Sequence, residues 1–252
     1  MTSAILLTGG TGTLGRHVTP LLCAAGYKVR SLSRQARPDT DGVEYVVGDL
    51  LKDEGIEPAV AGAEVVLHLA GSAKGDDAAT RNLARAAAHA GVRHLVCISV
   101  IGADKVPIGY FRAKLGAERA VADSGVPWTV LRAAQFHDLT LTAVRAMARL
   151  PLVPAPGGLR LQPVDARDVA ARLVELAGGD PAGLVAGLAG PRVYTMADLT
   201  RGYLQARGKR RPMFPVRVPG GPGRAYRAGA NLDLDADKGT RSWEDFLAER
   251  AR

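Results

Sequence analysis

The chain has 252 residues, of which 47% are hydrophobic and 23% charged, a balance that is ordinary for a globular protein with a substantial core. This length suits one large α/β domain or a main domain with a small appendage, so two independent domains and long disordered stretches are not expected. The formal net charge is +8, yet no run of adjacent basic residues exceeds Lys209-Arg210-Arg211. Nucleic-acid binding is therefore not expected.

Membrane insertion and metal binding are not expected either. No apolar run reaches the roughly 18 residues that cross a bilayer, and the amino terminus leads into an apolar strand without a basic leader. Cys23 and Cys97 stand far apart in apolar segments, which is typical of small core residues, and the histidines lack the spacing of metal ligands. These observations favour a cytoplasmic protein and leave monomer and homodimer open.

Short apolar runs alternate with longer amphipathic stretches over the first two-thirds of the chain, which predicts repeated βα units on a parallel sheet. Strands are predicted at residues 4–8, 28–33, 44–47, 65–69, 94–99 and 128–132. Helices are predicted at about 14–25, 78–90 and 109–124, each followed by a glycine that ends it. The predicted fold class is α/β, a Rossmann-type doubly wound parallel sheet with its binding crevice at the carboxyl ends of the strands.

After Arg132 the rhythm changes. The sequence predicts a helix at about 139–149, a short strand at 162–164, and a helix that begins near Asp168, whose carboxylate can cap it. Residues 212–223 contain four prolines and three glycines, which predicts a loop or an irregular edge rather than a core element. The expected organisation is a dinucleotide-binding core over residues 1–135. Residues 136–252 then supply the remainder of the core and a small substrate-facing lobe, in one compact unit.

The strongest signal is a glycine-rich turn between the first predicted strand and the first predicted helix. Glycines allow a sharp turn, close approach of the backbone to a pyrophosphate and tight packing of helix on strand. Free amide groups at the start of the helix then face the phosphates. A tight turn alone would also use glycines, but the strand–turn–helix context favours a phosphate cradle. The residues expected to form it are Gly9, Thr11, Gly12, Thr13, Leu14 and Gly15.

The residues after the second and third predicted strands concern the choice between NAD(H) and NADP(H) and the contacts of the adenine ring. Ser33 and Arg34 end the second predicted strand, where an NAD-binding protein usually offers an acidic residue to the ribose. With Arg37 nearby, they favour the 2′-phosphate of NADP(H) over NAD(H). Asp49, after the third predicted strand, can accept a hydrogen bond from the adenine amino group while Leu50 packs beside the ring. It can equally cap a turn, and both interpretations stay open.

Motifs along nearly the whole chain point to a known family. They are TGGTGTLGR at 8–16, GDL at 48–50, LHLAG at 67–71, GVRHLVCISVIGAD at 91–104, YFRAKLGAE at 110–118, SGVPWTVLRAAQFHDL at 124–139, VDARDVA at 164–170 and GTRSWEDFLA at 239–248. With these motifs the chain resembles the atypical short-chain dehydrogenase/reductases, in their NmrA-like NAD(P)H-binding branch.

This resemblance implies a Rossmann core that binds NADP(H), with the three glycines on the pyrophosphate, Arg34 on the 2′-phosphate, and Asp49 and Leu50 at the adenine. It further implies that the ribose and nicotinamide path is lined by His68, Leu69, Ala70 and Gly71. Ser99 would lie beside the nicotinamide, and Lys114 would reach its ribose.

A catalytic apparatus is suggested by Tyr110 and Lys114, which stand four residues apart and so share one face of a predicted helix. A tyrosine held near an ammonium group can have its pKa lowered, and it can then give a proton to a developing alkoxide. Ser99 can hold the carbonyl oxygen by a second hydrogen bond. The alternative is a chance pair on an amphipathic helix, which the resemblance makes less favoured.

Three residues after the sixth predicted strand are candidates for substrate contact. Gln135, Phe136 and His137 can touch the substrate or the nicotinamide, or they can form a turn that packs Phe136 into the core. The sequence leaves the two interpretations equal.

The predicted function is an NADPH-dependent reductase that transfers hydride to a small or medium carbonyl, quinone or enone compound, with Tyr110 as proton donor. The alternative is an NADP(H)-binding redox sensor of NmrA type without turnover. An epimerase of sugar nucleotides is less favoured, because the carboxy-terminal portion is short and Arg34 suits a 2′-phosphate. The expected partner is a small-molecule substrate, with no nucleic acid, membrane or metal.

Overall fold

The computed structural model describes residues 4–40, 42–72 and 74–250, which form two compact units. Unit 1 runs to Ser99 and adds Gly109–Arg132 and Val169–Val185. Unit 2 takes Val100–Ile108, Ala133–Asp168 and the described residues from Ala186 onward. The chain thus passes between the units several times, and each is described by itself.

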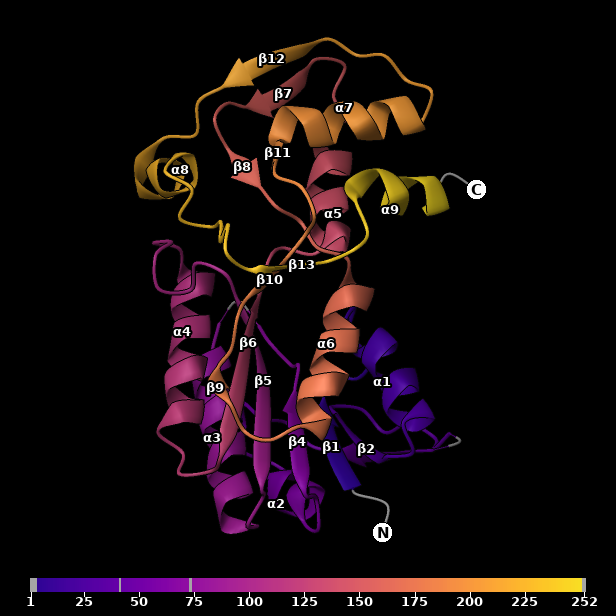
Figure 1. Ribbon diagram of the computed structural model, residues 1–252, viewed down its shortest axis with the longest axis vertical. Coiled ribbons are helices and arrows are strands. Elements are labelled where there is room, and N and C mark those ends of the chain that lie inside the picture. The colour runs from indigo at the N-terminus through magenta and orange to yellow at the C-terminus, as the bar shows by residue number, and fades with distance from the viewer. Residues whose placement is uncertain (1–3, 41, 73, 251–252) are drawn as a thin grey trace. The chain divides into compact units, whose positions relative to one another are not determined.

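Unit 1 alternates strands and helices along the chain (Figure 1). Its strands are β1 (Ala4–Thr8), β2 (Lys28–Ser33), β3 (Val43–Val47), β4 (Val65–His68), β5 (His94–Val100), β6 (Trp128–Ala133) and β9 (Gly183–Leu184). Its helices are α1 (Gly15–Ala24), α2 (Ile56–Val60), α3 (Asp76–His89), α4 (Gly109–Ala122) and α6 (Ala166–Gly178). The last residue of β5, the last of β6 and the first three of α6 belong to unit 2.

The sheet of unit 1 has the strand order β3-β2-β1-β4-β5-β6, and β9 pairs with β6. The pairs β1–β2, β1–β4, β2–β3, β4–β5 and β6–β9 are parallel. The order reverses between β1 and β4, and doubly wound sheets bind their ligands outside the carboxyl ends of the strands at such a reversal. This arrangement confirms the predicted Rossmann-type doubly wound parallel sheet.

Helices cover the sheet because its central strands are mostly apolar and are buried along their whole length. All residues of β4 and β5 are buried, as expected for parallel strands packed on both faces. One core cluster joins Leu6, Val66 and Leu95 of the strands to Leu83 of α3 and Val121 of α4. α3 and α4 run side by side (Figure 1), which brings the beginning of α3 against the middle of α4.

Unit 2 contains the helices α5 (His137–Met147), α7 (Met196–Ala206), α8 (Gly220–Arg227) and α9 (Trp243–Arg250). Its strands are β7 (Val153–Pro156), β8 (Arg160–Leu161), β10 (Leu188–Ala189), β11 (Tyr194–Thr195), β12 (Met213–Val216) and β13 (Asp237–Lys238). β7 pairs with β12, β8 with β11, and β10 with both β13 and Ala133. Its core packs Trp243 and Phe246 of α9 against Leu141 and Val144 of α5 and Leu199 of α7.

Residues 212–223 contain β12 and the beginning of α8. β12 belongs to a sheet of two strands, so the predicted edge is present, and Pro215 lies where a missing N–H leaves no further strand unpaired. The predicted strand at residues 162–164 is wrong. β8 ends before Pro163, and Val164 makes only an isolated bridge to Phe136.

The predicted cap of α6 is also wrong. The helix begins at Ala166, and the carboxylate of Asp165 accepts the backbone N–H of Arg167 at 2.8 Å. Asp168, inside the first turn, accepts the backbone N–H groups of Thr240 and Arg241 at 2.9 and 3.2 Å. Asp168 therefore fixes the segment before α9 and does not cap its own helix.

The two cysteines differ in their surroundings. Cys97 is buried in the sheet, as predicted, and burial raises the pKa of its thiol to about 12. Cys23 is only partly buried on α1, so the prediction of a core position holds for Cys97 alone. Within the described ranges, no helix is long and apolar enough to cross a membrane.

Candidate functional site

The glycine-rich turn after β1 is packed too closely for side chains on its inner side. Gly9 has φ +72°, and a Cβ there would stand 2.7 Å from the backbone nitrogen of Ala70, in the loop after β4. A Cβ on Gly15 would stand 2.2 Å from the carbonyl oxygen of Gly9. Glycine therefore lets this turn contact the neighbouring loop on one side and the start of α1 on the other.

The other side of the same turn is open. A Cβ on Gly12 would meet only the carbonyl oxygen of Gly9, at 3.2 Å. No acceptor within the described residues binds the backbone N–H groups of Thr13 and Leu14, and no side chain caps α1. Unpaired amides at a helix start attract anions, so this turn fits the pyrophosphate of a dinucleotide.

The residues predicted for the adenine end follow β2 and β3. Arg34 is exposed directly after β2 and makes no ion pair within the described part of the chain. Asp49 Oδ1 accepts the backbone N–H groups of Leu51 and Lys52 at 2.9 and 3.3 Å, while Leu50 is buried. The turn-capping interpretation of Asp49 is thus realised, and its contact with adenine stays a prediction.

His68 does not line a ligand path, contrary to what the resemblance implied. It is buried, with Nδ1 at 2.7 Å from the hydroxyl of Thr8 and Nε2 at 3.0 Å from the hydroxyl of Thr80. Thr80 gives its own proton to the carbonyl of Asp76, so it must accept from Nε2–H, and Nδ1 accepts from Thr8. Burial, with a smaller effect of Lys114, lowers the pKa of His68 to about 3. The neutral ring thus links Thr8 of β1 to Thr80 of α3 by hydrogen bonds, and its role is structural.

A loss of stability in mild acid is expected from His68. In the unfolded chain the imidazole of His68 is protonated near the ordinary histidine pKa of 6.5, whereas in the folded chain it is protonated only near pH 3. Stability therefore falls as pH drops through this window, by about 2 kcal/mol between pH 7 and pH 5. Urea unfolding at both pH values should show this loss in the wild type and in His89→Asn, an exposed control. It should be absent from His68→Asn, and an equal loss there would contradict the assignment.

Lys114 forms a buried ion pair that the sequence did not predict. Its Nζ lies 3.1 Å from Asp76 Oδ2, and the two side chains are 6% and 3% exposed. The ammonium also donates to the carbonyl of Ile98 at 3.4 Å. A Cβ on Gly71 would come within 2.8 Å of the same Nζ. Lys114 thus lies directly beside Gly71, in the loop after β4.

Close packing of two helices positions this pair. Asp76 is the first residue of α3, where a carboxylate is favoured by the helix dipole, and its Oδ1 accepts the backbone N–H of Ser72 at 3.2 Å. On α4, a Cβ on Gly116 would stand 2.8 Å from Cβ of Asp77, so the glycine permits a close helix–helix contact. This contact holds Asp76 within reach of Lys114.

The electrostatics correct one expectation about Tyr110. Burial acts to lower the pKa of Lys114, but the Asp76 carboxylate and weaker neighbours more than offset it, and the pKa is raised. The pKa of Tyr110 is also raised, because burial outweighs the lowering effect of Lys114 and Asp76 adds to the rise. The predicted lowering is therefore wrong.

Ser99 is engaged elsewhere. Its hydroxyl donates to the carboxylate of Glu118 on α4, which Arg132 also binds, at 2.8 Å through Nε and 2.7 Å through Nη2. Ser99 is buried, and its one proton is given to Glu118. The geometry thus gives no support to Ser99 as donor to a carbonyl oxygen. Tyr110, by contrast, is 38% exposed and has no hydrogen-bond partner within the described residues.

The three candidates after β6 belong to unit 2 and have different surroundings. His137 is fully buried, with its ring centroid 4.9 Å from that of Phe246 and 5.7 Å from that of Trp243. It packs the core of unit 2, so the predicted substrate contact of His137 is wrong. Phe136 is half-buried. The amide of Gln135 is shielded from solvent and has no partner among the described side chains.

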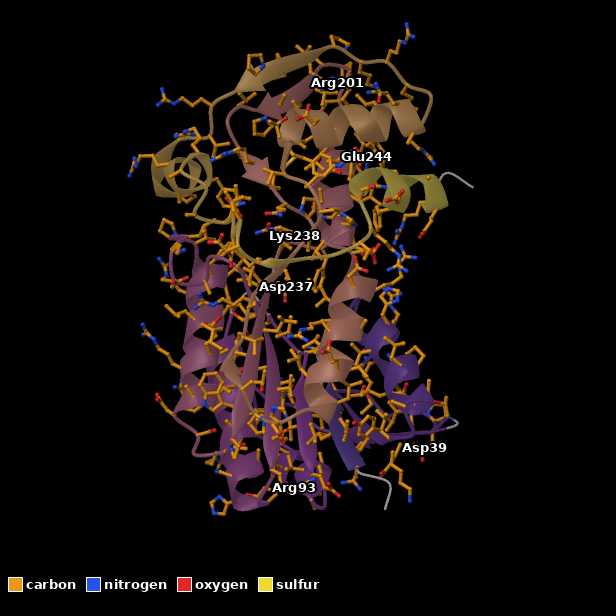
Figure 2. All side chains as sticks on the ribbon, in the orientation of Figure 1. Asp39, Arg93, Arg201, Asp237, Lys238 and Glu244 are labelled. Atoms are coloured by element: carbon orange, nitrogen blue, oxygen red, sulfur yellow. The ribbon has the colours of Figure 1, made fainter. Side chains whose placement is uncertain are left out.

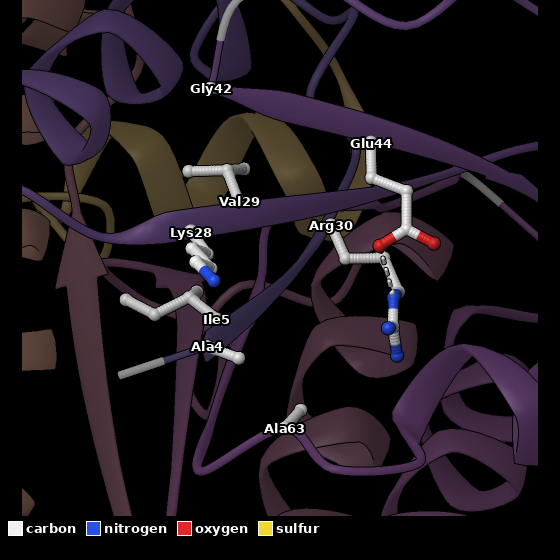
Figure 3. Close-up of a pocket in the computed structure, with 8 residues that line it drawn as sticks. All are labelled: Ala4, Ile5, Lys28, Val29, Arg30, Gly42, Glu44 and Ala63. Carbon is white, nitrogen blue, oxygen red and sulfur yellow. Dashed lines mark hydrogen bonds and ion pairs between the residues drawn. The ribbon is translucent and has the colours of Figure 1, made fainter. Parts of the chain in front are cut away.

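A cavity of about 240 Å³ lies at the opposite end of the strands from the glycine-rich turn. Figure 3 shows its lining, which includes Ala4 and Lys28 at the beginnings of β1 and β2, and the ion pair of Arg30 with Glu44 at 3.0 Å. Because ligands of doubly wound sheets bind at the carboxyl ends of the strands, this cavity is not the cofactor site. No group of metal-ligating side chains is present in the described ranges.

Comparison with known proteins agrees with this geometry. A family model described as NAD(P)H-binding matches residues 9–181. The chain is 36% identical over 203 residues to the (4-alkanoyl-5-oxo-2,5-dihydrofuran-3-yl)methyl phosphate reductase of Streptomyces griseus subsp. griseus, covering 78% of this chain and 71% of that protein. It is 28% identical over 216 residues to Quinone oxidoreductase 2 of Escherichia coli, covering 81% and 75%.

The fold has close structural counterparts. The crystal structure of the NADPH-dependent quinone oxidoreductase QOR2 from Escherichia coli, complexed with NADPH, matches with a TM-score of 0.82. The match covers 98% of this chain and 100% of the other at 21% identity, and it concerns the fold. The family expected from the motifs is thereby confirmed. The chain belongs to the NAD(P)H-binding family, in the NmrA-like branch of the atypical short-chain dehydrogenase/reductases.

Proposed function

We propose that the chain is an NADPH-dependent reductase of a small or medium carbonyl, quinone or enone compound. The observation that carries the proposal is the buried Lys114–Asp76 pair, in which Lys114 lies beside Gly71 and stands on α4, the helix that also presents Tyr110. The names of two relatives support it. A 4-alkanoyl-5-oxo-2,5-dihydrofuran and a quinone both hold a carbon–carbon double bond conjugated to a carbonyl. Enones and quinones are therefore the first compounds to screen.

Bound NADPH would supply a hydride to the substrate carbon, and the chain's own residues would hold and orient it. Lys114 keeps its positive charge at neutral pH, because its pKa is raised, and an ammonium suits the hydroxyls of the nicotinamide ribose. The open amides of the turn suit the pyrophosphate. The remaining proposed contacts are Ser33 and Arg34 at the 2′-phosphate, Asp49 and Leu50 at the adenine, and Leu69, Ala70 and Gly71 along the ribose and nicotinamide.

Preference for NADPH over NADH is expected to depend on Arg34. Its exposed guanidinium has no acidic partner within the described part of the chain, so it is free to bind a phosphate. Arg34→Ala should weaken NADPH binding by roughly 10- to 100-fold and leave NADH binding unchanged. Nicotinamide fluorescence titrations measure both affinities.

A matched control is Arg93→Ala, which removes the same charge just before β5, at the opposite end of the sheet, where Figure 2 labels it. Its two affinities should equal those of the wild type. If Arg34→Ala weakened the binding of NADPH and of NADH equally, Arg34 would not bind the 2′-phosphate.

Tyr110 is the proposed proton donor. Because its pKa lies above the ordinary value, the hydroxyl stays protonated at neutral pH, and an alkoxide or enolate oxygen close to it can accept that proton. The phenolate that remains would lie near the Lys114 ammonium, whose effect on the Tyr110 pKa is to lower it.

Replacement of the hydroxyl tests this role. Tyr110→Phe should lower NADPH-dependent reduction of carbonyl compounds by about 10²- to 10⁴-fold while NADPH affinity stays unchanged. Stopped-flow absorbance of NADPH with a panel of aldehydes, ketones, enones and quinones measures the rates. Unchanged turnover on every substrate of that panel would remove Tyr110 from the mechanism.

A second candidate function is an NADP(H)-binding redox sensor without turnover. Two observations favour it: the hydroxyl of Ser99 is committed to Glu118, and the pKa of Tyr110 is raised rather than lowered. A sensor would show no NADPH oxidation on the full panel, together with a purified partner that binds only one redox state of the nucleotide. NADPH turnover with any enone or quinone decides for the reductase.

A further inference from the structure

The positive charge of the chain is concentrated in two segments of unit 2. Residues 139–164 and 199–232 contain eleven of the Lys and Arg residues and no Asp or Glu, so the rest of the chain has a net charge of −3. The acidic residues that begin α5 and α7 are already paired, Asp138 with Arg250 and Asp198 with Arg201. No acidic residue lies at the carboxyl end of either helix.

These two ends meet at a pocket of about 310 Å³, where α7 lies across the end of α5 (Figure 1). Its cations come from three stretches of chain: the end of α5, the turn that follows it, and the segment before β12. The lining, here named the basic pocket, consists of Arg145, Ala148, Arg149, Tyr203, Leu204, Lys209 and Arg211. Four of its seven residues are cationic and none is acidic.

Capping of the helix ends accounts for only one of these cations. Arg211 donates from Nη1 to the carbonyls of Arg149 and Leu150 at 3.1 and 2.7 Å, so it fixes the turn after α5. The side chains of Arg145, Arg149 and Lys209 bind no carbonyl or carboxylate within the described residues. Cations that share one pocket without a counter-ion repel each other, and an anion between them relieves this repulsion.

We propose that the basic pocket binds a small phosphorylated molecule through a phosphate or diphosphate group. The volume lies at the lower end of small-ligand sites, and guanidinium groups match the geometry of phosphate oxygens. Arg145, Arg149 and Lys209 bind the oxygens, Arg211 holds the turn that carries Arg149, and Tyr203 offers a hydroxyl. The site consists of unit 2 residues alone, so it is independent of the proposed reductase activity.

Calorimetric titration of the full chain with inorganic pyrophosphate at low ionic strength tests the proposal. The double variant Arg145→Gln/Arg149→Gln should bind pyrophosphate at the pocket at least about tenfold more weakly than the wild type. The control is Arg201→Gln/Arg224→Gln, which removes two exposed charges of the same unit outside the pocket. It should bind like the wild type, and its thermal unfolding midpoint shows whether loss of charge alone alters the fold.

Three results would overturn the proposal. The first is an identical pyrophosphate titration for the wild type and the pocket variant, since binding at the glycine-rich turn is unaffected by these substitutions. The second is an equal loss in pocket and control variants, which would mean non-specific attraction by net charge. The third is a single-stranded oligonucleotide that binds more tightly than pyrophosphate and weakens equally in both variants. That result would identify a broad nucleic-acid face rather than a pocket.

Discussion

Asp76→Asn is expected to lower the free energy of unfolding by about 3–5 kcal/mol, because it leaves the buried ammonium of Lys114 without its partner. The substitution keeps the size of the side chain, so the loss reports charge rather than packing. Urea unfolding at pH 7 measures it. The expected effect is large because both side chains are almost fully shielded from water and lie 3.1 Å apart.

The adjacent residue provides the control for this prediction. Asp77 is also in the first turn of α3, but its ion pair with Arg81 is exposed and 3.6 Å long, so Asp77→Asn should cost less than about 1 kcal/mol. The double variant Asp76→Asn/Lys114→Met should recover part of the lost stability, since it removes the unpaired charge. Equal stability of Asp76→Asn and Asp77→Asn would show that the buried pair contributes nothing.

Gly15→Ala is expected to disrupt the glycine-rich turn after β1. The added Cβ would stand 2.2 Å from the carbonyl oxygen of Gly9 and 2.5 Å from Cα of Gly10, and both of these are backbone atoms. The turn must therefore move away from α1, and NADPH affinity should fall by at least about 100-fold, which corresponds to 2.7 kcal/mol. Fluorescence titration with NADPH measures the loss. Gly179→Ala, where a Cβ meets only ordinary contacts of 3.6 and 3.8 Å, is the control.

Gly12→Ala separates the two explanations for these glycines. In the protein itself this Cβ makes a single tight contact, at 3.2 Å from the carbonyl oxygen of Gly9, which a shift of a few tenths of an ångström relieves, so the unfolding midpoint should change little. If the turn cradles a pyrophosphate, the methyl group occupies the space that the phosphate needs, and NADPH binding should still be lost. Wild-type NADPH affinity in Gly12→Ala would mean that the glycines serve the turn alone.

The regular elements of unit 1 could be predicted because their signals are local. β1 and β2 begin and end at the predicted residues, and β3 begins one residue earlier than predicted. In each case a short stretch with apolar or alternating apolar residues next to a turn signal was enough. For residues 212–223 the proline-rich composition predicted a loop or an irregular edge, and it did not identify the strand with which that edge pairs. Pairing of β12 with β7 decided the outcome there.

Most of the electrostatic environment of the site could not be predicted. Asp76 stands 38 positions before Lys114, and no spacing in the sequence connects them; only the close packing of α3 on α4 does so. Glu118, which accepts the proton of Ser99, and Arg132, which binds the same carboxylate, are likewise brought together by the sheet and α4. The sequence showed the spacing of four residues between Tyr110 and Lys114, but it could not predict that Asp76 is the ion-pair partner of the lysine.

The sequence by itself determined the order of β1 to β6 and of α1, α3 and α4 in unit 1, the glycine-rich turn with the helix that follows it, and membership of the NAD(P)H-binding family. These depend on residues close together along the chain, whose spacing limits the backbone directly. Only the tertiary structure decided that His68 is a buried, neutral histidine and that Lys114 forms an ion pair with Asp76. It also decided that the pKa of Tyr110 is raised and that His137 lies in the core of unit 2. Burial and charge at a point depend on every element that packs around it, and those elements come from distant parts of the chain.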